Sequence, residues 1–75
     1  MSEKCILLFG IMPLCVGDYV RIYPRGMRSM IIITGRITSI GDNAIMIETR
    51  SGSLLVIRLS EIRMAEKIPA EGGAP

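Results

Sequence analysis

The chain has 75 residues and so forms a single domain near the lower limit for independent folding. Hydrophobic residues make up 49% of it, more than so small a core can bury. The surplus apolar surface is expected to be buried against other copies, the more common outcome, or to meet a membrane. The formal net charge of +2 is too small to indicate a nucleic-acid binder by itself, and the absence of histidine and of a Cys-x-x-Cys pair argues against a zinc site.

Residues 1–16 are an apolar lead-in, uncharged from Cys5 onward. A membrane-spanning helix needs about 20 apolar residues, so this run is too short to cross a bilayer. A short strand, a short helix and a segment packed against a neighbouring copy all remain open, because periodicity does not decide between them in so short a run. No secretory signal is evident, and Cys5 and Cys15 are therefore expected to be reduced thiols in a cytoplasmic protein.

The rest of the chain up to residue 68 predicts five short antiparallel strands separated by Gly, Asp, Asn and Ser turns. The expected strands are residues 19–23, 31–40, 44–50, 53–59 and 62–68. Ile40 falls out of the alternation of its strand, which predicts a bulge or bend that Gly35 would ease. The predicted fold is all-β: a small, strongly bent five-stranded barrel over residues 17–68, with the lead-in packed outside it and a disordered tail over residues 69–75.

Apolar residues also occur on the outward face of these strands, where a lone barrel would expose them to water. Together with the fourth and fifth strands, which would be left as open edges, they predict a homo-oligomer, with strand edges paired between copies to give a ring. The predicted interface residues are Ile32, Met46, Leu54, Val56, Ile62 and Met64.

Three segments resemble a known family. Residues 13–22 read Pro-Leu-Cys-Val-Gly-Asp-Tyr-Val-Arg-Ile, residues 35–40 read Gly-Arg-Ile-Thr-Ser-Ile, and residues 57–62 read Ile-Arg-Leu-Ser-Glu-Ile. In order and spacing they resemble the middle β-domain of small mechanosensitive (MscS-type) channels and, more distantly, the Sm/LSm and Hfq RNA-binding proteins. The resemblance implies an Sm-like fold, assembly into a ring, and a role as an assembly or scaffold module.

The Sm resemblance also implies an alternative function, the binding of single-stranded RNA at pore-facing loops. The residues concerned are Asp42, Asn43, Arg58 and Ser60. Arg58 stands where Sm proteins use an Arg, although Glu61 replaces the Sm Asn. The plainer role for Arg58 is a surface ion pair with Glu61 or with Glu48 of a neighbouring copy, worth about 0–1 kcal/mol.

Catalysis finds no support in the sequence, so neither an enzyme nor a cofactor is expected. The carboxylates Asp18, Asp42, Glu48 and Glu61 lie in separate turns and strands, and no nucleophile has a base partner or a phosphate loop. Membrane association through the lead-in is the least favoured role, because Lys4 is its one flanking basic residue.

Overall fold

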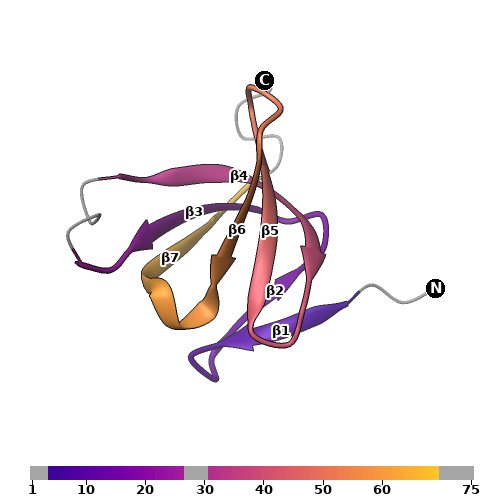
Figure 1. The fold of residues 1–75 in the computed structure, drawn as a ribbon. Helices are drawn as coiled ribbons and strands as arrows, with labels where there is room; N and C mark the ends of the chain where they lie inside the picture. Colours follow the sequence, from indigo (N-terminus) through magenta and orange to yellow (C-terminus); the bar gives the residue numbers. More distant parts are fainter. Residues whose placement is uncertain (1–3, 27–30, 70–75) are drawn as a thin grey trace.

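The computed structural model describes residues 4–26 and 31–69, and every regular element except one short turn is a β-strand (Figure 1). The elements are β1 (Cys5–Leu8), β2 (Met12–Cys15), β3 (Tyr19–Pro24), β4 (Ile33–Ile40), β5 (Ala44–Thr49), β6 (Leu54–Arg58), the 3₁₀ turn η2 (Leu59–Glu61) and β7 (Ile62–Ile68). The prediction of an all-β chain is confirmed. All but the first residue of the predicted tail, residues 69–75, lie outside the described residues.

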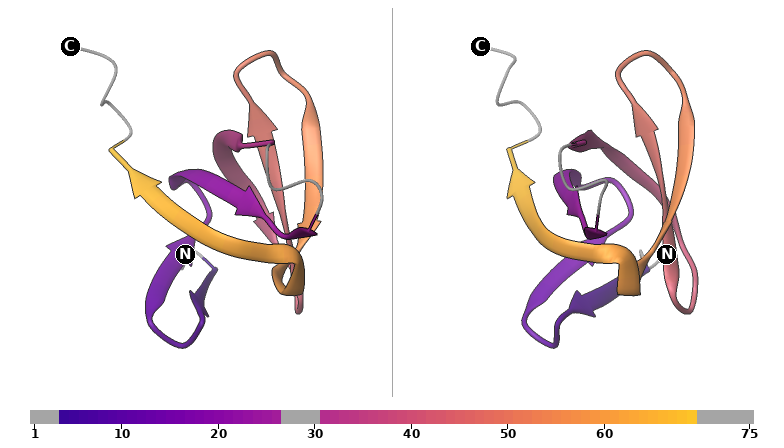
Figure 2. Two further views of the ribbon diagram at one scale, coloured as in Figure 1. Left: turned by 90° about the vertical axis from the view of Figure 1, so that its left-hand side faces the viewer. Right: turned by 60° about the vertical axis from the view of Figure 1, so that its left-hand side comes forward.

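The main sheet is antiparallel and open, which corrects the predicted closed barrel. Its strand order is β6-β5-β4-β3-β7, so β6 and β7 stand at opposite ends of the five-stranded sheet. They are consecutive in sequence, but η2 turns the chain so that β7 runs away from β6 and pairs with β3 (Figure 2). Closure would need β6 and β7 to pair with each other, and they do not.

A bulge bends β4 at the place where the sequence pattern breaks. The register of β4 against β5 shifts between Ile37 and Ser39, and Ile40 is thereby returned to the buried face. Gly35 lies two residues earlier, where a Cβ would overlap the carbonyl oxygen of Glu48 and come within 2.6 Å of Ile47 Cγ2. The predicted bulge is confirmed, and glycine is required because β4 and β5 approach closely there.

The core lies inside the curl of the sheet and is closed from below by a hairpin of β1 and β2 (Figure 1). Val20, Ile22, Ile37 and Ile47 are fully buried, as alternation predicts. The hairpin adds the buried side chains of Leu8 and Leu14, so the lead-in completes the core instead of packing outside it.

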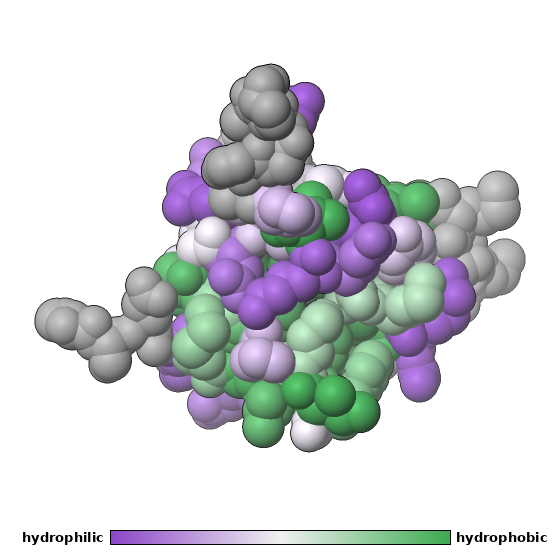
Figure 3. All heavy atoms as spheres, turned by 180° about the vertical axis from the view of Figure 1, so that it is seen from behind, coloured by the Kyte–Doolittle hydropathy of each residue, from purple (hydrophilic) through white to green (hydrophobic). Residues whose placement is uncertain are grey.

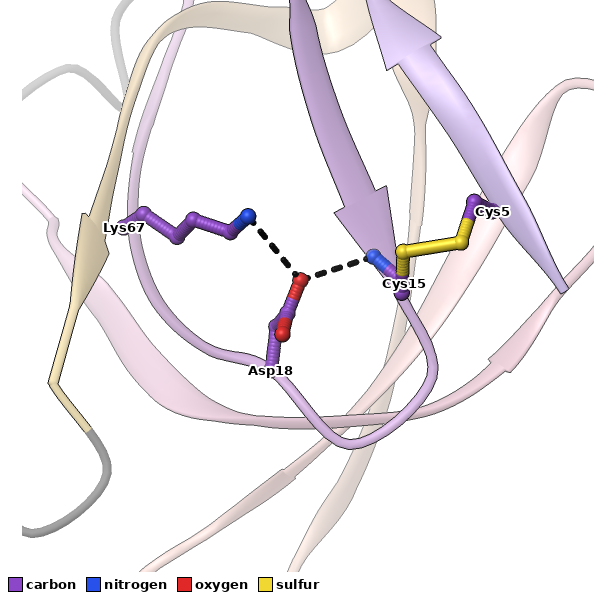
Figure 4. Close-up of a disulfide and its surroundings, with 4 residues drawn as sticks. All are labelled: Cys5, Cys15, Asp18 and Lys67. Atoms are coloured by element: carbon purple, nitrogen blue, oxygen red, sulfur yellow. Dashed lines mark hydrogen bonds and ion pairs between the residues drawn. A yellow bond between two sulfur atoms is a disulfide. The ribbon is translucent and has the colours of Figure 1, made fainter. Parts of the chain in front are cut away.

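The two cysteines form a disulfide across this hairpin, so the prediction of reduced thiols is wrong (Figure 4). Antiparallel pairing of β1 and β2 places Cys5 directly opposite Cys15, with their Cα atoms 4.0 Å apart. The Cys15 amide donates to Asp18 Oδ2 at 2.8 Å, and Lys67 Nζ lies 3.4 Å from the same oxygen. The disulfide end of the hairpin is thus connected to β7.

Among the described residues, no helix has the length and apolar character needed to cross a bilayer.

Candidate functional site

The outer side of β6 is an unpaired strand edge in the described part of the chain. The Thr49 amide donates to the Ser53 carbonyl, and the Leu59 amide donates to the Asn43 carbonyl, both at 2.8 Å. These two bonds lie at the two ends of the β5–β6 ladder and mark its hydrogen-bonded pairs. Because hydrogen-bonded pairs recur at every second residue of an antiparallel ladder, Leu55 and Ile57 also direct their backbone groups toward β5. The N–H and C=O groups of Leu54 and Val56 therefore point away from the sheet and can pair with a further strand.

An apolar groove of about 450 Å³ runs along this edge. Its lining residues come from both faces of β6, from the end of β3, from the start of β4 and from η2: Pro24, Arg25, Ile31, Ile33, Leu55, Val56, Ile57, Arg58 and Glu61. The Arg25 amide donates to the Glu61 carbonyl at 2.9 Å, which holds the part of the groove that follows β3 against η2. An extended segment laid along β6 would find backbone partners at the edge and apolar contacts beside it.

Most of the predicted interface residues are accessible in the single chain. Leu54 and Val56 are 60% and 66% exposed, and Ile32 and Met64 are also exposed, whereas Met46 is half-buried.

Ile62 departs from that prediction, because it is 1% exposed and belongs to the core. Simple alternation would place Ile62 and Met64 on the same face of β7. The register against β3 shifts where Pro24 faces Ile62 and Tyr23 faces Met64, so Arg63 is an extra residue on β7. This bulge turns Ile62 inward and Met64 outward.

The four predicted RNA-contacting residues are exposed and lie at one end of the sheet. Arg58 pairs with Ala44 in the β5–β6 ladder, and the Leu59 amide binds the Asn43 carbonyl, so the turn containing Asp42 and Asn43 adjoins the segment from Arg58 to Ser60. The structure brings these two segments together.

Arg58 has no carboxylate within ion-pair distance among residues 4–26 and 31–69. The ion pair with Glu61, which the sequence left open, is not formed, and Glu48 is engaged by Arg36 within the chain at 3.4 Å.

No family model, curated protein or solved structure matches this chain. The resemblance to mechanosensitive channels and Sm proteins stays a prediction, and the candidate site rests on the geometry of β6, β7 and the adjoining turns.

Sequence reasoning missed the polar contacts that support β7. Arg21 Nη1 donates to Glu66 Oε1 at 2.8 Å, and the Tyr23 hydroxyl donates to the same oxygen at 3.3 Å. The hydrogen bond to Glu66, with a smaller contribution from Tyr23, raises the pKa of Arg21 above its ordinary value. Arg21 faces Glu66 in the β3–β7 register, so opposite charges at matched positions of two predicted strands were the available signal.

The described residues contain no group of three or more His, Cys, Asp or Glu side chains arranged to hold a metal ion.

Proposed function

We propose that this chain is a non-catalytic assembly module whose copies join by pairing β6 of one with β7 of the next. The observation that carries the proposal is the open sheet, in which β6 and β7 are the two end strands. Unpaired strand edges with apolar side chains are templates for pairing with a strand of another chain. Joining the two different edges repeats the same head-to-tail contact from copy to copy, and such a contact forms a ring when the rotation between successive copies closes.

The side chains around the edges support this pairing. Leu54 and Val56 are exposed on one side of β6, and the apolar groove lies along the same strand. Met64 is exposed on β7, where it would meet the neighbouring copy. An incoming β7 would therefore bury apolar surface in addition to forming backbone hydrogen bonds.

Replacing Val56 with proline tests this assembly directly. Proline removes the outward amide of Val56 but leaves the bonds of Leu55 and Ile57 to β5 in place, and edge strands tolerate proline. We expect wild-type protein to give an oligomer mass by light scattering at micromolar concentration, and Val56→Pro to give a monomer with a native circular dichroism spectrum.

The matched control is Val56→Thr, which keeps both the amide and the β-branched shape and should still assemble. A wild-type protein that is monomeric across the micromolar range would refute the proposal.

A second candidate function is the binding of single-stranded RNA at the sheet end formed by Asp42, Asn43, Arg58 and Ser60. It is favoured by the clustering of these residues and by the absence of an ion-pair partner for Arg58 within the described chain. A guanidinium in such a place donates to phosphate or stacks on a base. Copies arranged in a ring would present several such sites.

We expect oligo-uridine to bind more weakly as salt concentration rises and Arg58→Ala to lower the affinity about tenfold, since one charged contact contributes on the order of 1–2 kcal/mol. Fluorescence anisotropy measures both effects. Arg36→Ala is the control, because Arg36 is also exposed but is paired with Glu48. Equal affinity for wild type and Arg58→Ala would remove Arg58 from the site.

A further inference from the structure

The tip of the β1–β2 hairpin exposes a set of large apolar side chains. Leu7, Phe9 and Ile11 are 61%, 61% and 79% exposed. Figure 3 shows apolar surface gathered at the lower end of the molecule, where the hairpin lies. None of these side chains belongs to the β6 edge, the groove or the sheet end that contains Arg58.

The backbone at this tip has a conformation that does not favour the residue present. Phe9 has φ +54° and is followed by Gly10 at φ +71°. Glycine and asparagine adopt positive φ readily, whereas a bulky aromatic residue does so at a cost. A phenylalanine is thus held in an unfavourable conformation and placed in water, two features that folding alone would select against.

The hairpin is rigid and internally hydrogen-bonded. The Ile11 amide donates to the Leu8 carbonyl at 3.0 Å, and the Gly10 amide donates to the Leu7 carbonyl at 3.3 Å. The disulfide holds the opposite end of the hairpin, and Leu8 and Leu14 anchor it to the core. The amides of Gly10 and Ile11 would therefore remain hydrogen-bonded if the tip entered an apolar phase.

We propose that this tip inserts shallowly into the interface of a lipid bilayer. Three side chains of this size expose on the order of 400 Å². A stable protein interface takes about 800 Å² from each partner and adds hydrogen bonds at a polar rim. Residues 5–17 carry no charge that would form such a rim.

The size and character of the tip therefore fit lipid better than a protein partner. The sequence alone made membrane association the least favoured role, whereas the exposed tip favours it. The lipid proposal does not depend on assembly through β6 and β7.

The first test measures the sedimentation of wild-type protein with phosphatidylcholine vesicles and with vesicles containing phosphatidylserine. We expect Phe9→Asn and Ile11→Asp to lower vesicle binding at least tenfold on both compositions. Asparagine suits positive φ, so Phe9→Asn should have an unchanged or higher melting temperature, which separates lost binding from misfolding. Tyr19→Asp is the control, because Tyr19 is exposed on β3, outside the hairpin and the groove.

The second test uses the absence of tryptophan from the chain. The single tryptophan of Phe9→Trp should shift its emission to shorter wavelength when vesicles are added and become protected from acrylamide. The tryptophan of Tyr19→Trp, on β3 and outside the groove, should show neither change. Light scattering on the same samples reports assembly separately, so failure of lipid binding and failure of ring formation are distinguishable.

Unchanged emission of Phe9→Trp with vesicles, or equal vesicle binding by wild type and Phe9→Asn, would overturn the proposal. An emission shift that follows protein concentration in the absence of lipid would also overturn it, because a second copy would then be covering the tip.

Discussion

Single residues determine where this small sheet bends and which side chains face inward. Gly35 permits the close approach of β4 and β5, because any Cβ there would overlap the backbone of Glu48. The alternation of Val20 and Ile22 is visible in the sequence, and both are buried. The burial of Ile62 could not be predicted from the sequence, because it depends on the bulge at Arg63, the extra residue of β7 in its register with β3.

At this scale we expect Gly35→Ala to lower the free energy of unfolding by about 1–3 kcal/mol, since the new methyl group must displace backbone. Gly41→Ala is the matched control: its Cβ would lie 3.5 Å from the Ala44 carbonyl oxygen, an ordinary contact, and should change stability by less than about 0.5 kcal/mol. Urea titrations at one fixed protein concentration measure both. Equal stabilities of the two variants would show that β4 and β5 can separate at no cost.

At the level of elements, the hairpin of β1 and β2 is the part that sequence reasoning described least well. Its apolar run suits a strand, a helix or a packed segment equally, so the pairing of Cys5 with Cys15 could not be derived. Only the register of the hairpin brings the cysteines together. Once formed, the disulfide connects through Asp18 and Lys67 to β7.

We expect reduction of this disulfide to lower the free energy of unfolding by about 2–3 kcal/mol, the usual effect of closing a short loop. The double variant Cys5→Ser, Cys15→Ser should match the reduced wild type and show no response to reductant. Thermal unfolding with and without a phosphine reductant makes the comparison. Identical melting curves for oxidised and reduced wild type would mean that the core contacts of Leu8 and Leu14 suffice to hold the hairpin.

For the whole molecule, alternation predicted the strands of the main sheet and most of its core, whereas closure was predicted wrongly. Side-chain periodicity indicates which face of a strand is buried, but it does not indicate whether the two end strands of a sheet pair with each other. Here η2 directs β7 toward β3 and leaves the edges of β6 and β7 apart. The candidate interface was largely foreseeable because Leu54 and Val56 are apolar at outward positions, whereas the groove beside them depends on the open sheet.

The central claim is that the outward edge of β6 is paired with another copy, and hydrogen exchange at the Val56 amide tests it most directly. This amide faces away from β5 and has no strand partner among residues 4–26 and 31–69, so protection that is lost on dilution must come from a neighbouring copy. We predict that it exchanges slowly at micromolar concentration, at a rate close to those of Leu55 and Ile57, and that it loses protection on dilution. Exchange as fast as that of Ser51 in the exposed β5–β6 turn, at every concentration, would contradict the proposed assembly.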